Sequence, residues 1–218
     1  MKYILKKILF RNLALVRRVP FGLYANLLLE IDPSCETQLL LGLYERETYP
    51  WLRKAVTKAR SAVDVGAGNG EMTVWFLSKE NLIKVHAFEP DGQRKAKFER
   101  NIRANNFKTD GRLFFHPEPF GGSNAKQLLQ ELSQPILLKI DIDGGEGSLL
   151  EEIREELRSR SIQLLLEVHS EELWKRCSQL LKEEGYQVRE IRQGWLKRII
   201  PERRPSAFNQ WLVASKAD

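Results

Sequence analysis

The sequence predicts an α/β fold built on a mostly parallel, doubly wound sheet with an antiparallel C-terminal edge. From Ser61 onward, short β-rich runs alternate with helical patterns, which is the order expected of βαβ units. The runs at 136–141 and 162–168 are mostly apolar, as expected for strands buried on both faces. Two final β-rich runs, at 187–191 and 210–214, flank a basic loop at 194–209, and we expect them to form the antiparallel edge.

The other elements follow from the same patterns. The expected strands span 61–65, 84–88, 112–116, 136–141, 162–168, 187–191 and 210–214. The expected helices cover 72–77, 91–105, 125–132, 149–157 and 171–184. A glycine at 185 stops the last of them.

Length and charge divide the chain into two parts. With 218 residues, the chain suits one domain with a short extension. We expect the extension over residues 1–40 and the cofactor-binding domain over residues 41–218. The net charge of +6 is supplied by six basic residues that precede the first acid, Glu30. They are Lys2, Lys6, Lys7, Arg11, Arg17 and Arg18. The body of the chain is therefore neutral, which removes the main composition argument for a nucleic-acid partner.

Residues 1–19 have the pattern of a basic amphipathic helix that Pro20 ends. The pattern fits an interfacial anchor on an anionic membrane and equally a helix packed on the domain or a partner, with a transit peptide as a third interpretation. The sequence contains no apolar run long enough to span a membrane. We expect a cytoplasmic protein, with peripheral contact at the inner membrane surface if the helix is an anchor.

Two cysteines, Cys35 and Cys177, lie far apart without metal-binding spacing. This usage fits a reducing compartment rather than a disulfide framework or a zinc site. Cys177 lies on a helical pattern beside Trp174 and is expected to be a small buried hydrophobe.

A glycine-rich loop follows the first strand of the alternating region. Asp64, Gly66, Gly68 and Gly70 form the pattern D-x-G-x-G-x-G. Glycines let a ligand approach the backbone closely, and the next helix begins with N–H groups that have no partner inside the helix. A dinucleotide fingerprint requires a glycine where this chain has Glu71, and an acid there would repel a pyrophosphate.

An acid at the end of the second strand completes the cofactor prediction. Glu89 lies 23 residues after Gly66, where a carboxylate can accept hydrogen bonds from both ribose hydroxyls. A nucleoside with a sulfonium and no phosphate tolerates this acidic environment, so the sequence predicts S-adenosyl-L-methionine. The expected cofactor-binding residues are Asp64, Gly66, Ala67, Gly68, Glu89, Pro90 and Asp141.

Polar residues at the ends of the next two strands are candidates for chemistry. Asp141 or His169 could take a proton from an acceptor hydroxyl, and Lys139 could orient the acceptor. Asp143 and Glu146 fit helix capping equally well, and Glu167 fits a partner of Lys139 or His169. A metal site made of Asp141, Asp143 and His169 has suitable atoms but no diagnostic spacing, so we expect no metal ligands.

Ordered blocks over residues 42–192 resemble the FkbM-type methyltransferases. The blocks are Tyr44-Glu45, Val63–Gly70, Ala87-Phe88-Glu89-Pro90, Asn101 with Asn105, Lys139–Gly144 and Glu167-Val168-His169. The resemblance implies a Rossmann-like, seven-stranded methyltransferase fold. It also implies methyl transfer to a hydroxyl oxygen of a sugar, a glycan or a secondary metabolite.

The sequence thus predicts an S-adenosylmethionine-dependent O-methyltransferase with a small-molecule or glycan acceptor. A nucleic-acid methyltransferase is one alternative, but D-I-D-G at residues 141–144 replaces the N-P-P-Y-type loop that amino methylation needs. Another alternative is a membrane-associated protein that keeps the fold without turnover. A nicotinamide oxidoreductase is disfavoured by Glu71.

Overall fold

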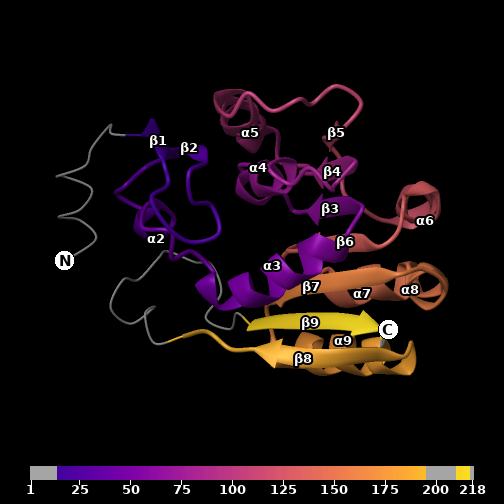
Figure 1. Cartoon of the computed structure of the whole chain (residues 1–218). Coiled ribbons are helices and arrows are strands. Elements are labelled where there is room, and N and C mark those ends of the chain that lie inside the picture. Colours follow the sequence, from indigo (N-terminus) through magenta and orange to yellow (C-terminus); the bar gives the residue numbers. More distant parts are fainter. Residues whose placement is uncertain (1–13, 195–209, 217–218) are drawn as a thin grey trace.

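A seven-stranded sheet forms the centre of the protein in the computed structural model, which describes residues 14–194 and 210–216 (Figure 1). The strand order is β5-β4-β3-β6-β7-β9-β8. The strands are β3 (Ser61–Val65), β4 (Lys84–Phe88), β5 (Leu113–His116), β6 (Ile136–Ile140), β7 (Ile162–Val168), β8 (Tyr186–Ile191) and β9 (Gln210–Lys216). Neighbours from β5 to β7 are parallel, whereas β9 runs antiparallel to both β7 and β8. The predicted fold class is confirmed.

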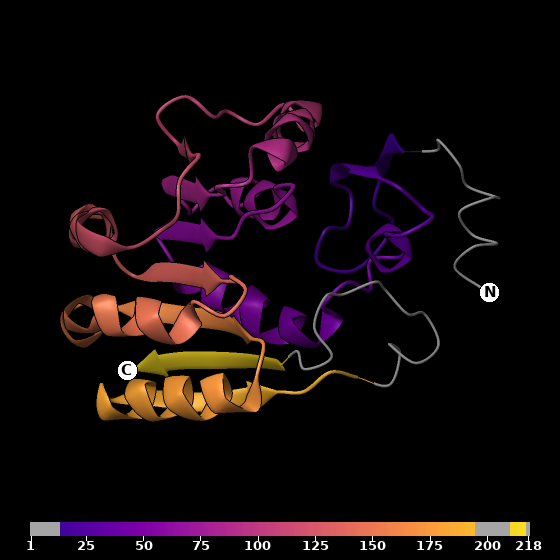
Figure 2. The ribbon, with the colours of Figure 1, turned by 180° about the vertical axis from the view of Figure 1, so that it is seen from behind.

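Helices cover both faces of this sheet. They are α3 (Tyr49–Lys58), α4 (Glu71–Leu77), α5 (Gly92–Ala104), α6 (Gly122–Glu131), α7 (Glu146–Glu152), α8 (Arg154–Ser159) and α9 (Glu171–Glu183). Residues of α3, α4 and α5 pack in one apolar cluster, and residues of α6 to α9 pack in a second. The view from behind shows α7, α8 and α9 in front of the sheet, on the side away from α3 (Figure 2). Successive strand residues enter opposite clusters, as with Leu137 and Leu138, because side chains alternate along a strand.

The predicted helix over residues 1–19 is wrong for its last turn. Residues Leu15–Arg18 form strand β1, which pairs antiparallel with β2 (Leu28–Ile31). The backbone of β2 is itself held by α5: Leu28 donates to Asn105 Oδ1 at 2.9 Å, and Glu30 donates to Asn101 Oδ1 at 2.7 Å. Strand pairing on this fixed edge outweighs the local helical pattern. Residues 1–13 lie outside the described part of the chain.

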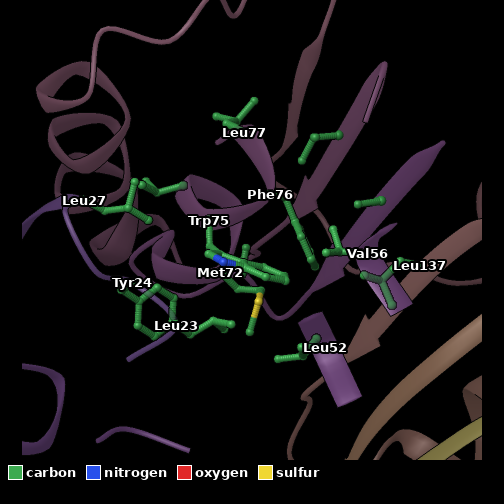
Figure 3. Packing of buried hydrophobic residues seen from close by; sticks show 14 of the residues in the cluster. Leu23, Tyr24, Leu27, Leu52, Val56, Met72, Trp75, Phe76, Leu77 and Leu137 are labelled. Atoms are coloured by element: carbon green, nitrogen blue, oxygen red, sulfur yellow. The ribbon is translucent and has the colours of Figure 1, made fainter. Parts of the chain in front are cut away.

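The segment that follows β1 contributes to the core of the domain. Leu23, Tyr24 and Leu27 pack with Met72 and Trp75 of α4 (Figure 3). Beyond β2 the chain forms α2 (Thr37–Leu40) and the short 3₁₀ helix η1 (Arg46–Thr48). The proposed division at residues 40 and 41 remains a prediction, although side chains from both sides of it share one core.

Smaller differences from the expected boundaries concern the loops. Strand β6 ends at Ile140, which leaves Asp141 just beyond it, and the helix expected over 149–157 is divided into α7 and α8. Helix α6 begins at Gly122 rather than Ala125. Cys177 is fully buried, as expected. Most of the predicted basic loop, residues 195–209, lies outside the described residues. Among the helices that the structure does describe, none has the length and apolar character to cross a membrane.

Candidate functional site

A cleft of about 540 Å³ lies where β3, β4, β6 and β7 end. Each of these parallel strands points its carboxyl end at the cleft, which is the usual ligand position in doubly wound sheets. Residues from four strand ends line it, and the N-terminal segment supplies Tyr24, Cys35, Glu36 and Leu39. The expected residues that line the cleft are Gly66, Ala67, Gly68, Glu89, Pro90, Lys139, Asp141 and His169.

The glycine loop packs too closely for side chains. Gly66 has φ +72°, and a Cβ there would lie 1.9 Å from the carbonyl oxygen of Asp141. Gly70 has φ +88°, and a Cβ there would lie 2.7 Å from the ring of Phe98. Only glycine fits both the left-handed backbone and the available space. The loop therefore brings its backbone directly to the cleft wall.

Glu89 joins the loops that follow β3 and β4. Its Oε2 accepts from the Gly68 N–H at 2.7 Å and its Oε1 accepts from the Asp91 N–H at 2.9 Å. The residue is only 6% exposed but lines the cleft. A carboxylate oxygen can accept more than one hydrogen bond, so Glu89 is held in place and can still receive hydroxyl donors.

Asp64 is fully buried and is not among the residues that line the cleft. Thr73 Oγ1 donates to its Oδ2 at 2.6 Å, and Lys139 Nζ lies 3.6 Å from its Oδ1. Burial raises the pKa of Asp64, and the positive charge of Lys139 opposes that shift. The geometry makes Asp64 a support for the cleft floor.

Lys139 is the cation at the centre of this arrangement. Its Nζ donates to the carbonyl of Gly66 at 3.1 Å and to Asp141 Oδ2 at 3.3 Å. Burial by itself would lower the pKa of Lys139, but the carboxylates of Asp141 and Asp64 hold it above its usual value. Lys139 is therefore better suited to be a positively charged hydrogen-bond donor than a base.

His169 lies among carboxylates from the loop after β6, the start of α7 and the end of β7. Its Nδ1 lies 2.5 Å from Oε1 of the fully buried Glu146, the first residue of α7. Its Nε2 lies 3.8 Å from Asp141 Oδ1, 3.6 Å from Asp143 Oδ1 and 4.0 Å from Glu167 Oε1. The hydrogen bond that His169 donates to the Glu146 carboxylate raises the pKa of His169, and burial opposes that shift. We assign the Nδ1 proton to the Glu146 hydrogen bond, which leaves Nε2 facing the other carboxylates.

Acidic side chains outnumber basic ones in the cleft wall. The acids are Glu36, Glu45, Glu71, Glu89, Asp91, Asp141, Asp143 and Glu167. Among the described lining residues, the permanently charged bases are Arg94 and Lys139. Burial raises the pKa of Glu71, and the positive charge of Lys97 opposes that shift. Such a cleft favours cationic or neutral ligands over phosphates.

Several residues of the site were not predicted. Tyr24, Glu36 and Leu39 reach the cleft from the N-terminal segment, and no motif marks them. Glu146 was considered as a helix cap, but its carboxylate instead binds His169 and, more weakly, the N–H of Gly144 at 3.3 Å. Glu167, expected to be a partner of Lys139 or His169, lies 4.0 Å from His169 Nε2 through Oε1. Its Oε2 also accepts a hydrogen bond from Trp211 Nε1 at 3.2 Å, which was not predicted.

Comparisons with known proteins agree with this geometry at the level of the fold. No family model and no curated protein matches the sequence. An rRNA methylase from Streptococcus thermophilus has a TM-score of 0.56 and 13% identity over 80% of this chain and 98% of its own. A methyltransferase FkbM from Methylobacillus flagellatus has a TM-score of 0.55 and 18% identity over 72% of this chain and 43% of its own. The chain has the methyltransferase fold.

A third similar structure contains a ligand. It is a Streptococcus pneumoniae protein assigned as a tRNA methyltransferase and determined in complex with S-adenosyl-L-methionine. Its TM-score is 0.51, with 14% identity over 78% of this chain and 72% of its own. These identities are low, and the acceptors named for the similar proteins differ. The fold by itself therefore does not decide between small molecules and RNA.

Proposed function

We propose that the protein is an S-adenosylmethionine-dependent methyltransferase. The observation that carries the proposal is the junction of Gly68 and Glu89, where the glycine loop is hydrogen-bonded to an acid at the end of β4. In this fold, that junction is suited to a nucleoside whose ribose hydroxyls donate to Glu89 and whose remainder lies along the loop. The bound ligand of the similar Streptococcus pneumoniae protein supports this cofactor.

The charges of the cleft favour this cofactor over a dinucleotide. Glu71 lines the cleft near the loop, where a pyrophosphate would meet a carboxylate. S-adenosylmethionine carries a positive sulfonium and a positive ammonium group against one carboxylate, so its net charge is positive. An acidic wall attracts this net positive charge, so the same residues that repel a dinucleotide favour S-adenosylmethionine.

The acceptor in our proposal is a hydroxyl of a sugar, a glycan or a secondary metabolite. Its oxygen attacks the sulfonium methyl in line, the methyl–sulfur bond breaks, and the hydroxyl proton is lost. The protein contributes chiefly by orientation and by assisting the loss of that proton. Lys139 stays charged and orients the acceptor oxygen. Asp141 and His169 lie beside each other at the same end of the cleft, and either could take the hydroxyl proton. The buried Asp64 pairs with Lys139 and keeps it in position, and Thr73 in turn donates a hydrogen bond to Asp64.

RNA is the second candidate acceptor, because two of the similar structures are assigned to RNA methylation. The acidic cleft wall argues against a phosphate backbone entering it. A third interpretation keeps the cofactor but has no turnover, with membrane contact through residues 1–19. Residues 1–13 of that segment lie outside the described residues, so the contact remains a prediction.

Label transfer distinguishes these functions. Purified protein is incubated with S-adenosylmethionine labelled in its methyl group, together with glycans, small hydroxyl compounds or RNA. We expect label on an oxygen of a hydroxyl compound, located by mass spectrometry, and none on RNA. Label on RNA would replace the proposed acceptor. Cofactor binding with no label on any acceptor would support the third interpretation, a protein that binds the cofactor but does not transfer its methyl group.

A further inference from the structure

We propose that Asp141, Glu167 and His169 form a binding site for a divalent cation at the edge of the cleft. One ligand atom from each residue lies within 4.8 Å of the others. Ligands at about 2.0–2.5 Å from one ion lie about 3–5 Å apart. The measured separations from His169 Nε2, 3.8 Å to Asp141 Oδ1 and 4.0 Å to Glu167 Oε1, fall in this range and are too long for hydrogen bonds.

The two carboxylates are held by groups outside the cluster. Asp141 binds Lys139 through Oδ2 at 3.3 Å, and its Oδ1 is the oxygen that lies toward His169. Glu167 accepts from Trp211 Nε1 through Oε2 at 3.2 Å, and its Oε1 lies toward the same nitrogen. Each carboxylate therefore uses one oxygen for an anchor and directs the other to a common point. Carboxylates with one anchored oxygen and one oxygen available as a ligand are typical of a preorganised metal site.

The imidazole follows the same arrangement. Its Nδ1 is anchored by Glu146 at 2.5 Å, and Glu146 is fully buried. A carboxylate behind a histidine ligand fixes the tautomer and the ring orientation in metal sites. The other ring nitrogen, Nε2, faces Asp141 and Glu167. Three ligands from two strand ends thus converge, and each is oriented by a residue that is not a ligand.

A cation would also offset the local excess of negative charge. Asp143 Oδ1 lies 3.6 Å from Nε2 in addition to the two proposed carboxylate ligands, and its side chain is 81% exposed. Lys139 is engaged with Asp64 and Asp141. We therefore place Asp143 on the solvent side of the ion, where it can act through water. The sequence-based metal hypothesis named Asp143 as a ligand; in the proposed site Glu167 takes that place.

The role of the ion rests on the proposed methyl transfer, whereas its binding does not. Asp141 is 30% exposed and lines the cleft, so solvent or an acceptor oxygen can reach the ion. A hydroxyl bound to a divalent cation is more acidic than one in water, so its proton leaves to solvent before the oxygen attacks the methyl group. In this arrangement Asp141 and His169 would act as ligands, and Lys139 would still orient the acceptor.

Binding of Mn²⁺ tests the site directly. The full-length protein, stripped of metal with a chelator, is titrated with Mn²⁺ and followed by electron paramagnetic resonance. We expect one saturable site, with an affinity at least about tenfold weaker in Glu167→Gln and in His169→Ala. Glu36→Gln is the matched control, because it makes the same substitution in another part of the cleft wall and should leave the affinity unchanged.

A second readout covers the possibility that these variants fold poorly. Trp211 donates to Glu167, so Tb³⁺ at the site should show luminescence sensitised by this indole and lost when Mn²⁺ displaces it. S-adenosylmethionine binding is measured without metal in parallel. Absence of Mn²⁺ binding, or equal binding by Glu167→Gln, would overturn the site while leaving the proposed function intact if the cofactor binds. Mn²⁺ binding without cofactor binding would support the site and contradict the proposed function.

Discussion

Glu146 and His169 are joined by a 2.5 Å contact between Oε1 and Nδ1, although one begins α7 and the other follows β7. Glu146 has no exposed surface, so the bond lies behind the cleft and not in it. The contact orients the imidazole with Nε2 toward Asp141 and Glu167. A glutamate that would otherwise serve only to begin a helix thereby sets the geometry of the site.

The substitution Glu146→Gln should weaken Mn²⁺ binding. An amide keeps the size of the side chain but loses the charge that holds the Nδ1 proton, and such outer partners contribute about 10–100-fold in metal affinity. The Mn²⁺ titration measures the change. Glu151→Gln, on the same helix but with its carboxylate near Arg154, serves as the control. Equal Mn²⁺ affinity in Glu146→Gln and the wild type would show that Glu146 has no positioning role.

Replacing Gly66 by alanine should destabilise the protein more than replacing Gly111. Both glycines have positive φ, +72° and +66°, so each substitution incurs the left-handed backbone penalty of about 1–2 kcal/mol. A Cβ at Gly111 meets nothing within 4 Å, whereas a Cβ at Gly66 would lie 1.9 Å from the Asp141 carbonyl. Urea unfolding of the two variants measures the difference. Equal losses would mean that the loop can move away from Asp141 at little cost.

Removing the charge of Lys139 should lower the free energy of unfolding more than removing the charge of Asp64. Lys139→Met leaves Asp64 and Asp141 without their shared cation, and breaking a buried pair in this way costs about 3–5 kcal/mol. Asp64→Asn should cost less, because Lys139 keeps Asp141 and the Thr73 hydroxyl can still donate to the amide oxygen. Chemical denaturation gives both free energies of unfolding. The reverse order would contradict the central place given to Lys139.

Acid should destabilise the protein through His86. Burial, followed by the charges of His116 and Lys84, lowers the pKa of His86 to about 4. The unfolded chain binds this proton at about pH 6.5, so stability falls as the pH decreases from about 6.5 to 4, by about 3 kcal/mol in total. His86→Phe keeps a ring for stacking on Phe114 but cannot be protonated. Its free energy of unfolding should vary less over this range; an unchanged pH dependence would exclude His86 as the source.

The sheet and the cofactor loop were predictable because their signals are local. The runs at 84–88 and 162–168 match β4 and β7 residue for residue. The second run is mostly apolar, as expected for a parallel strand that is buried on both faces. The glycines of the loop mark positive φ, and Glu89 follows its strand directly. These features can be read within a few residues of chain.

The remaining features depend on contacts between distant segments. Residues 15–18 become a strand because β2 lies beside them, and β2 is held by Asn101 and Asn105, more than 70 positions away. The anchor of Glu167 is Trp211 on β9, and that of His169 is Glu146 on α7. No spacing in the sequence marks these pairs, because they arise only when the sheet order brings β7 beside β9 and α7 near the end of β7.

Calorimetric titration of the purified protein with S-adenosylmethionine, with NAD⁺ titrated in parallel, tests the central claim most directly. We expect saturable binding of one S-adenosylmethionine per chain and no binding of NAD⁺. Glu89→Ala removes an acceptor of two ribose hydroxyls and should weaken binding at least about tenfold, whereas the exposed Glu118→Gln should not change it. Unchanged affinity in Glu89→Ala, or no binding of S-adenosylmethionine to the wild type, would contradict the account.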